Sequence, residues 1–278
     1  TNIVDAMSYF NVDRSMLIAE FKTYARRPPV AFDRRLYNAA LNHSNDMIAR
    51  NAQDHNGQFT RVTSAGFTYT SAGGNVYSYA EDAKFAHVGF NVDWGPGGSG
   101  GMQAGRGHRM NIMSVHSDFS NVGIASVSES NPATRVGPEV VTQNFCWANT
   151  GVANHYNQFL VGTVWTDSNA NGIYDPGEGH GGVSVTPDKG TFYAVTGDAG
   201  GWAIPVTASG EHILTFSGGA LSQAQNKTAS VGGTSELVYW DTNDTFIFIP
   251  IPALDPVGFS VLALLLAFLG WSLRSQMT

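Results

Sequence analysis

The residues from Asp167 to Glu178, DSNANGIYDPGE, place oxygen-bearing side chains at a spacing that suits a calcium ion. Side chains that can ligate through oxygen occupy positions 1, 3, 5, 9 and 12 of this run: Asp167, Asn169, Asn171, Asp175 and Glu178. Gly172 stands at position 6, where a calcium loop turns sharply, and Ile173 at position 7 can offer its backbone carbonyl. Because hard oxygen donors favour Ca²⁺ over a transition metal, we expect Ca²⁺ to bind here. The alternative is an ordinary turn rich in Asp, Asn and Gly.

Short runs typical of β-strands surround this loop, and none has the spacing of an amphipathic helix. They are separated by Gly, Asn, Asp and Ser: residues 159–167, 182–187, 191–198, 201–206, 212–216, 228–231 and 235–240. Strands of this length and spacing predict a small β-sandwich. The calcium loop would then join two strands rather than the two helices of an EF-hand.

Composition excludes one class of partner and favours a location outside the cytoplasm. Of the 278 residues only 13% are charged and 32 are Gly, which suggests loop-rich or β-rich structure. The net charge is −7 and Lys and Arg form no cluster, so nucleic acid is not an expected partner. The single cysteine, Cys146, cannot form an internal disulfide, and we expect it to be buried as a small apolar side chain.

The stretch from Val257 to Leu273 is predicted to cross a membrane. It contains 17 residues without a charge, close to the roughly 20 that span a bilayer core. Trp271 lies where an interfacial aromatic residue belongs, and Arg274 follows the stretch. Because basic residues stay on the cytoplasmic side, residues 274–278 would form a cytoplasmic tail and the rest would lie in the periplasm or outside the cell. The alternative is a buried core helix.

Small residues recur on one face of this predicted helix: Ala263, Ala267 and Gly270. Their spacing of i, i+4 and i+7 lets the backbone of another helix approach closely. We therefore expect the helix to contact other integral membrane subunits as well as lipid.

In the N-terminal half, residues 31–51 predict an amphipathic helix, because their apolar residues recur at helical spacing. Residues 119–127 and 139–146 alternate like two paired strands. Four further motifs lie between them: DHNG at 54–57, AGGNVYSYA at 72–80, HVGFNVDWG at 87–95 and GRGHRMNIM at 105–113. In this order, over roughly residues 15–150, the motifs resemble the CAP family of cysteine-rich secretory, antigen 5 and pathogenesis-related 1 proteins.

The resemblance implies an α-β-α sandwich with a central antiparallel sheet. It also implies a surface cleft lined by two histidines and two acids, which binds a divalent metal in some members. His55 of DHNG and His108 of GHR match the two histidines. The family's first acid falls at Gly74, so that acid is missing, and the second acid has no clean match. Asp93 and His87 are the candidates to approach the cleft instead.

The missing acid argues against catalysis. A protein zinc site takes three or four ligands, and two imidazoles do not complete one. General acid–base catalysis needs a carboxylate or an activated histidine within reach. We therefore expect neither Zn²⁺ in the cleft nor enzymatic activity, with His55 and His108 kept as hydrogen-bonded residues of a vestigial site. A metal-dependent hydrolase that uses this cleft is an alternative.

The second region resembles the SdrD B-like modules of bacterial surface proteins, β-sandwiches in which calcium stiffens a spacer. Two phrases carry this resemblance: VGTVWTDSNANGIYDPGEGHGGVSVT at 161–186 and TGDAGGWAIPV at 196–206. The expected fold class is thus α+β. Its segments are a CAP-like domain at 1–154, an SdrD B-like sandwich at 155–245, a linker at 246–256, a transmembrane helix at 257–273 and a tail at 274–278.

Three functions follow from this architecture. The first is a non-catalytic, membrane-anchored periplasmic subunit that braces a larger membrane protein complex. The order of domains also resembles an accessory subunit of bacterial photosynthetic reaction centre–light-harvesting complexes. The second is a solitary surface binding or adhesion protein, and the third is the metal-dependent hydrolase. The lost acid at Gly74 and the small-residue face of the predicted helix favour the first.

Overall fold

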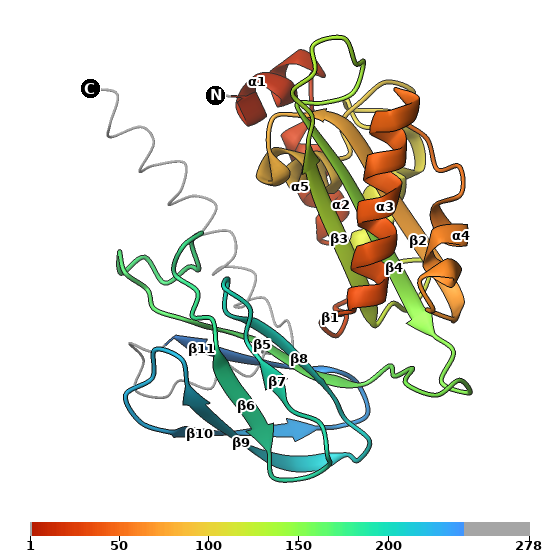
Figure 1. Cartoon of the computed structure of the whole chain (residues 1–278). Helices are drawn as coiled ribbons and strands as arrows, with labels where there is room; N and C mark the ends of the chain where they lie inside the picture. The colour runs from red at the N-terminus through yellow and green to blue at the C-terminus, as the bar shows by residue number, and fades with distance from the viewer. Residues whose placement is uncertain (1, 242–278) are drawn as a thin grey trace.

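The computed structural model describes residues 2–241. These residues form an N-terminal part, in which helices cover a sheet, and a C-terminal part built from strands (Figure 1). The predicted membrane helix with its small-residue face lies outside the described residues, as do the linker at 246–256 and the tail at 274–278. Within residues 2–241, no helix is long and apolar enough to cross a membrane.

A four-stranded sheet forms the centre of the N-terminal part. Its strands are β1 (Ala31–Phe32), β2 (Tyr69–Ala80), β3 (Asn121–Ser128) and β4 (Glu139–Ala148), in the spatial order β1-β3-β4-β2. β4 runs antiparallel to both β2 and β3, and the short β1 runs parallel to β3. The two strands expected from alternation, at 119–127 and 139–146, are β3 and β4.

One face of this sheet is covered by α3 (Arg34–Arg50), the helix predicted at 31–51. Asp33 caps its N-terminus, and Asn51 ends it in the left-handed conformation. The side of the helix that faces the sheet is buried: Leu36, Ala39, Ala40, His43, Ser44 and Met47. At Gly123 of β3 an added Cβ would collide with the backbone of Leu36, so glycine allows this close approach of helix and strand.

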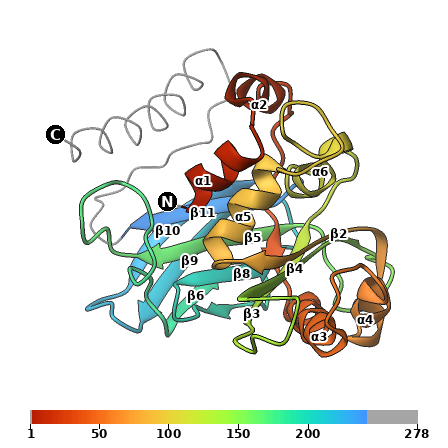
Figure 2. The same ribbon diagram turned by 90° about the horizontal axis from the view of Figure 1, so that it is seen from above.

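The opposite face of the sheet carries a second layer of helices (Figure 2). These are α1 (Asn2–Tyr9), α2 (Arg14–Phe21), α5 (Ala83–Val92), the 3₁₀ helix η1 (Ala104–Arg106) and α6 (Gly107–Ile112), while α4 (Gln58–Ser64) packs beside α3. Phe85, Phe90, Trp94 and Met102 form a core with Val141 of β4, and side chains of α1 and α2 pack against it. The three layers are the α-β-α sandwich that the resemblance implies.

The C-terminal part consists of two sheets packed face to face. One contains β6 (Val183–Pro187), β7 (Ala194–Val195), β9 (Gly210–Gly218) and β10 (Gln225–Val231), and the other contains β5 (Phe159–Trp165), β8 (Gly201–Pro205) and β11 (Glu236–Asp241). Between them lie the apolar side chains of the core: Leu160, Val164, Val183, Val185, Trp202, Ile204, Leu214 and Phe216. The predicted small β-sandwich is confirmed, although the strand expected at 191–198 is reduced to β7.

The chain between β4 and β5 is fastened to the N-terminal part. The side chain of Asn157 accepts from the backbone N–H of Ala148 at 2.8 Å and donates to its carbonyl at 2.9 Å. The ring of His155 is buried, and its Nε2 accepts from the backbone N–H of Thr68 at 2.8 Å. A small apolar cluster spans both parts: Ala31, Phe159 and Val161. The two parts are therefore joined by hydrogen bonds and by buried apolar surface.

Candidate functional site

His108 is held by a buried carboxylate. Asp93 ends α5 in the left-handed conformation, with φ of 56°, and is fully buried. Its Oδ1 lies 2.8 Å from Nδ1 of His108, and its Oδ2 accepts from the backbone N–H of His108 at 3.0 Å. Because a carboxylate accepts the Nδ1 proton, Nε2 is left as the free nitrogen of the ring. Asp93, one of the two candidates named from the sequence, thus positions His108.

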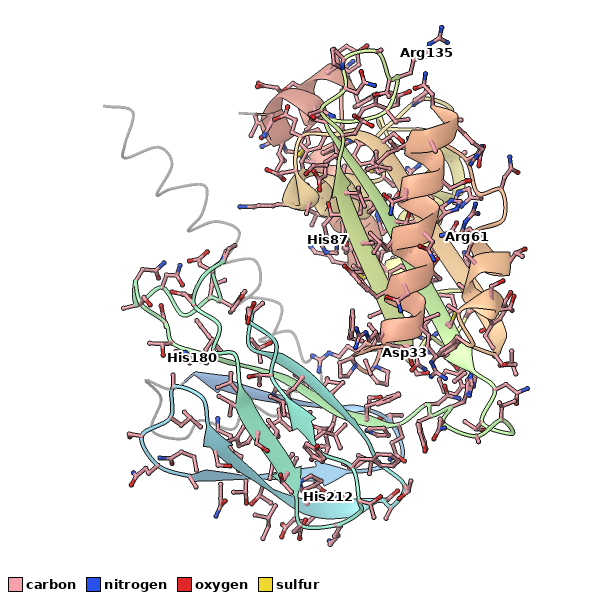
Figure 3. All side chains as sticks on the ribbon, viewed as in Figure 1. Asp33, Arg61, His87, Arg135, His180 and His212 are labelled. Atoms are coloured by element: carbon pink, nitrogen blue, oxygen red, sulfur yellow. The ribbon has the colours of Figure 1, made fainter. Side chains whose placement is uncertain are left out.

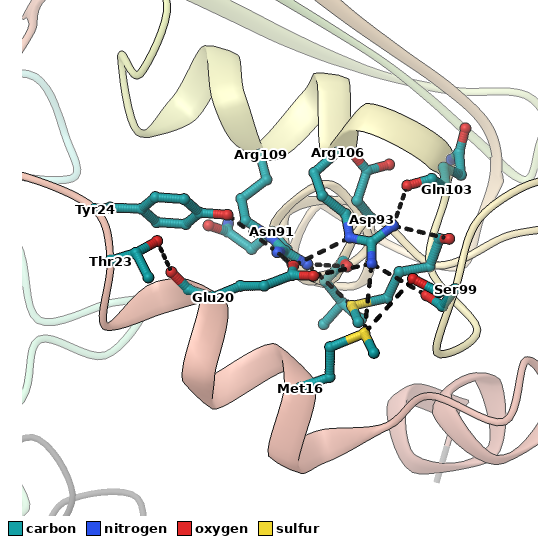
Figure 4. Close-up of polar contacts among 12 residues, drawn as sticks. Met16, Glu20, Thr23, Tyr24, Asn91, Asp93, Ser99, Gln103, Arg106 and Arg109 are labelled. Atoms are coloured by element: carbon teal, nitrogen blue, oxygen red, sulfur yellow. Dashed lines mark hydrogen bonds and ion pairs between the residues drawn. The ribbon is translucent and has the colours of Figure 1, made fainter.

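Two arginines of the motif GRGHRMN fix α6, the helix that carries His108 (Figure 4). Arg109 is fully buried and donates to two backbone carbonyls at the end of α5, both at 2.6 Å. Arg109 and Arg106 also both bond to the carboxylate of Glu20 on α2, with 3.0 Å from Nη2 of Arg106 to Oε1. Burial disfavours the charge of Glu20, but the hydrogen bonds and charges of the two guanidinium groups outweigh it and lower its pKa.

His55 is held by an amide instead. It precedes α4, and its Nδ1 lies 2.7 Å from Oε1 of Gln58 in the first turn of that helix. Gln58 is fully buried, and its Nε2 donates to Oδ1 of Asn144 at 2.8 Å and to the carbonyl of Gln143 at 3.3 Å. His55 itself is exposed. The amide of Gln58 therefore ties an exposed imidazole to the central strand β4.

Gly74 of β2 lies directly against the amide of Gln58. A Cβ added at Gly74 would stand 2.5 Å from Nε2 of Gln58 and 2.7 Å from its Cδ and Oε1. Position 74, where the family carries an acid, therefore has no side chain, and the amide of Gln58 fills the adjacent space.

His87 and a set of amides lie on the side of the sheet that carries His108. His87 on α5 (Figure 3) has Nδ1 3.4 Å from Nε2 of Gln143, and burial of its ring lowers its pKa, although part of the residue stays exposed. Oε1 of Gln143 accepts from Asn75 at 2.9 Å, and the same Asn75 amide donates to the carbonyl of His108 at 3.1 Å. Asn111 of α6 donates to Oδ1 of Asn75 at 2.8 Å, so it fixes this helix to β2.

The residues present do not fit the divalent metal that the family implies. Across residues 2–241, no group of three or more His, Cys, Asp or Glu side chains is placed to hold a metal ion. Asp93 is engaged by His108, and Gln58 supplies an amide where a carboxylate would be needed. An amide is a poorer ligand than a carboxylate for Zn²⁺, which takes N and S donors and carboxylate oxygens.

The sequence motifs pointed to His55, His108 and Asp93 but not to the amides that contact them in the structure. The signal was present in two motifs. Gln58 directly follows DHNG, and Gln143 with Asn144 forms the centre of VVTQNF. Two neighbouring residues of a strand point to opposite faces of the sheet. Gln143 therefore makes its contacts on the face that carries His108, and Asn144 makes its contacts on the face where Gln58 holds His55.

The loop predicted to bind calcium is closed by its own hydrogen bonds. Asp167 accepts from the backbone N–H of Gly172 at 2.7 Å, and Gly172 has the positive φ of 75° that the sharp turn requires. Glu178 accepts from the N–H groups of Ser168 and Asp175, both at 2.8 Å.

Asp175 lies at the centre of the same loop. Its Oδ2 accepts from the side-chain amides of Asn169 and Asn171, both at 2.8 Å, and these bonds lower the pKa of Asp175. Turning the two amides about their last bond would present oxygen in place of nitrogen. At the base of the loop, Nε2 of His180 (Figure 3) lies 2.6 Å from Oγ1 of Thr166. The calcium site remains a prediction.

Cys146 is buried, as expected. It lies on β4 with no exposed surface, and burial raises the pKa of its thiol to about 12. A thiol of this kind is not a nucleophile near neutral pH.

Comparison with known proteins identifies the N-terminal part. The sequence model of the cysteine-rich secretory protein family, CAP, matches residues 7–145. No curated protein matches the chain. Among solved structures, the chain is similar to an extracellular protein containing an SCP domain from Bacillus anthracis str. Ames, at 20% identity and a TM-score of 0.33. The match covers 52% of this chain and 40% of that one, so the chain spans less than half of that protein. This chain belongs to the CAP family, the cysteine-rich secretory protein family.

Proposed function

We propose that this chain is a non-catalytic, membrane-anchored accessory subunit that braces a larger membrane protein complex from outside the cytoplasm. The observation that carries the proposal is the junction between the CAP domain and the β-sandwich. A brace must transmit force between its attachment points, and a flexible linker would not do so.

Several contacts support a stiff junction. Asn157 makes two hydrogen bonds to the backbone of Ala148, and Ser120 donates to the same side chain at 2.5 Å. The buried ring of His155 packs against Phe67, with 5.1 Å between ring centroids, and accepts a backbone hydrogen bond. His155 and Asn157 lie on the connecting segment itself. Their contacts therefore fix the path of that segment and not only its ends.

Calcium would stiffen the second domain. We propose that Asp167, Asn169, Asn171, Asp175 and Glu178 hold Ca²⁺ together with the backbone carbonyl of Ile173. The loop contains three carboxylates between Asp167 and Glu178, and a divalent cation would offset their mutual repulsion. This feature agrees with the resemblance of residues 161–206 to SdrD B-like modules.

The cleft supports a role without chemistry. Its first acid is absent at Gly74, and Asp93, the carboxylate that holds His108, is fully buried.

The membrane helix at 257–273 gives the proposal its location. With Arg274 on the cytoplasmic side, both domains would lie in the periplasm, and Ala263, Ala267 and Gly270 would face a neighbouring helix. The order of CAP domain, sandwich and single helix resembles an accessory subunit of bacterial photosynthetic reaction centre–light-harvesting complexes. We propose such an assembly as the partner.

The small-residue face provides the test. Replacing Ala263 and Gly270 together by Leu should block close approach of a partner helix while keeping the helix apolar. We expect the variant to remain in the membrane fraction but to lose the integral membrane subunits that co-purify with the wild type in mild detergent. Leu262→Ala, outside that face, is the matched control and should keep them. Wild-type protein that purifies alone would contradict the proposal and favour a solitary surface protein.

A further inference from the structure

The pair Gly74 and Gln58 is complementary in space. Gly74 does not have a positive φ, so its backbone conformation does not demand glycine. What glycine supplies is room, because any Cβ there would stand 2.5 Å from the amide nitrogen of Gln58. A real Cβ does not come this close to a heavy atom that is not bonded to it. A side chain at position 74 and the observed position of Gln58 therefore exclude each other.

Gln58 cannot move aside at little cost. Its side chain is fully buried, and its amide is bonded at both atoms. Oε1 contacts Nδ1 of His55, and Nε2 donates to Oδ1 of Asn144 and to the carbonyl of Gln143. Displacing it would leave buried polar atoms without partners, which destabilises a protein more than the bonds themselves contribute.

The direction of this hydrogen-bond chain is set by a backbone carbonyl. The carbonyl of Leu36 can only accept, and it accepts from Nδ2 of Asn144 at 3.1 Å. Asn144 must then present its oxygen to Gln58, and Gln58 must present its oxygen to His55. His55 is thereby held with the proton on Nδ1. Within residues 2–241, its Nε2 has no hydrogen-bond partner, and the residue is exposed.

We propose that Gln58 has replaced the missing acid of the cleft. Its carboxamide fills the space beside Gly74 and holds the proton of the neutral His55 ring on Nδ1, so that Nε2 is the atom that accepts a hydrogen bond from an uncharged N–H or O–H donor. The exchange removes a negatively charged ligand, so the residues around His55 are poorly suited to a divalent metal. This inference concerns the cleft alone and holds whether or not the chain braces a complex.

The tautomer of His55 is the direct readout. The full chain in detergent, labelled with ¹⁵N histidine and observed at a pH where the ring is neutral, should show His55 with its proton on Nδ1. Gln58→Glu keeps an oxygen acceptor at the same reach and should keep this tautomer. Gln58→Met has a similar length without an acceptor and should lose it. A wild-type proton on Nε2, or a Gln58→Met spectrum like the wild type, would overturn the proposal.

A double-mutant cycle tests whether a side chain at position 74 competes with Gln58 for the same space. Gly74→Ala should lower Tm by about 5 °C, because the new methyl group meets the buried amide. Gly201→Ala is the matched control, since it also lies in a strand, has ordinary φ and would meet no atom within 4 Å. The double variant Gly74→Ala with Gln58→Ala should lose less than the sum of the single losses. Strictly additive losses, or a neutral Gly74→Ala, would show that the two residues do not compete.

Titration with Zn²⁺ alone addresses the metal. We expect the full chain to show no zinc binding that depends on both His55 and His108, measured by calorimetry with His55→Ala and His108→Ala as comparisons. Micromolar binding that either substitution abolishes would show that these histidines still form a metal site. It would contradict the proposal that Gln58 has replaced the acid.

Discussion

Glu20 is the residue on which the position of α6, the helix that carries His108, depends. A single carboxylate faces two arginines, and one of them, Arg109, has no exposed surface. An isolated buried guanidinium would be strongly unfavourable, because it cannot lose its proton. Glu20 therefore compensates the charge that the fold buries at Arg109, and it does so from α2, far away in the sequence.

Removing this charge should destabilise the protein. Glu20→Gln leaves Arg109 without its counter-charge, and we expect the free energy of unfolding to fall by about 2 to 3 kcal/mol, since Glu20 is partly exposed. Urea denaturation followed by circular dichroism measures this change. Asp118→Asn breaks the exposed pair with Arg27 and is the control, with an expected change of about 0.5 kcal/mol or less. Equal effects of the two substitutions would contradict the role given to Glu20.

The same residue predicts a dependence on pH. The pKa of Glu20 in the folded state lies below its ordinary value of 4.5, so the unfolded state binds the proton more tightly. Its contribution is fully present above pH 4.5 and is lost as the pH falls through the folded pKa. The difference in unfolding free energy between wild type and Glu20→Gln should therefore shrink below pH 4.5. A difference that stays constant down to pH 2 would count against this assignment.

At the residue scale, the sequence predicted the histidines but not what holds them. His55 and His108 are visible because their motifs are specific, and Asp93 because it is an acid beside one of those motifs. Gln58 carries no such signal, since glutamine is common on helix surfaces and its partner Gly74 belongs to another element. Only the packing of α4 against β2 shows that the two residues compete for one space.

The calcium loop is the element whose stability should respond to a ligand. It joins β5 to β6, where no helix supports it, and its three carboxylates are held by backbone and amide N–H groups. A bound cation should stabilise a loop with this composition, because its charge attracts the carboxylates more strongly than the N–H donors do.

Calcium should raise the thermal stability of the chain. At a Ca²⁺ concentration of 100 times Kd, one site adds about 2.7 kcal/mol, which corresponds to several degrees in Tm. Scanning calorimetry with and without a chelator measures the shift. Glu178→Gln removes the last carboxylate of the loop and should abolish most of the shift, whereas Asp198→Asn outside the loop should not. A Tm that is the same with calcium and with chelator would refute the site.

Elements with a strong pattern were predicted well and those set by packing were not. The helix expected at 31–51 is α3, because its apolar residues repeat over more than four turns. The strand expected at 191–198 shrinks to Ala194–Val195, since it is an edge strand with a single partner. The motif at 87–95 gave no sign of α5, which gains its stability from the layer of α1 and β2 around it.

At the scale of the whole molecule, a brace requires the CAP domain and the sandwich to move as one body. The apolar cluster of Ala31, Phe159 and Val161 and the bonds of Asn157 support this. Neither could be predicted from the sequence, because β1 is two residues long and the connecting segment has no periodic pattern.

Loosening the junction should be visible in solution. His155→Ala together with Asn157→Ala removes both anchors of the connecting segment. We expect a wider distribution of distances between spin labels placed at exposed Tyr79 and exposed Tyr193, measured by pulsed electron resonance in the full chain. Exposed Ser126→Ala is the control. A broad distribution already present in the wild type would mean that the two domains are not held as one body.

The composition of the native complex is the most direct test of whether this chain is a subunit of a larger membrane assembly. The chain would be purified in mild detergent from its own membranes, and the mass of the intact particle measured by native mass spectrometry. We expect a particle in which this chain is present in fixed ratio with integral membrane subunits. A particle with the mass of this chain alone, in membranes where it is abundant, would contradict the claim that it braces a complex.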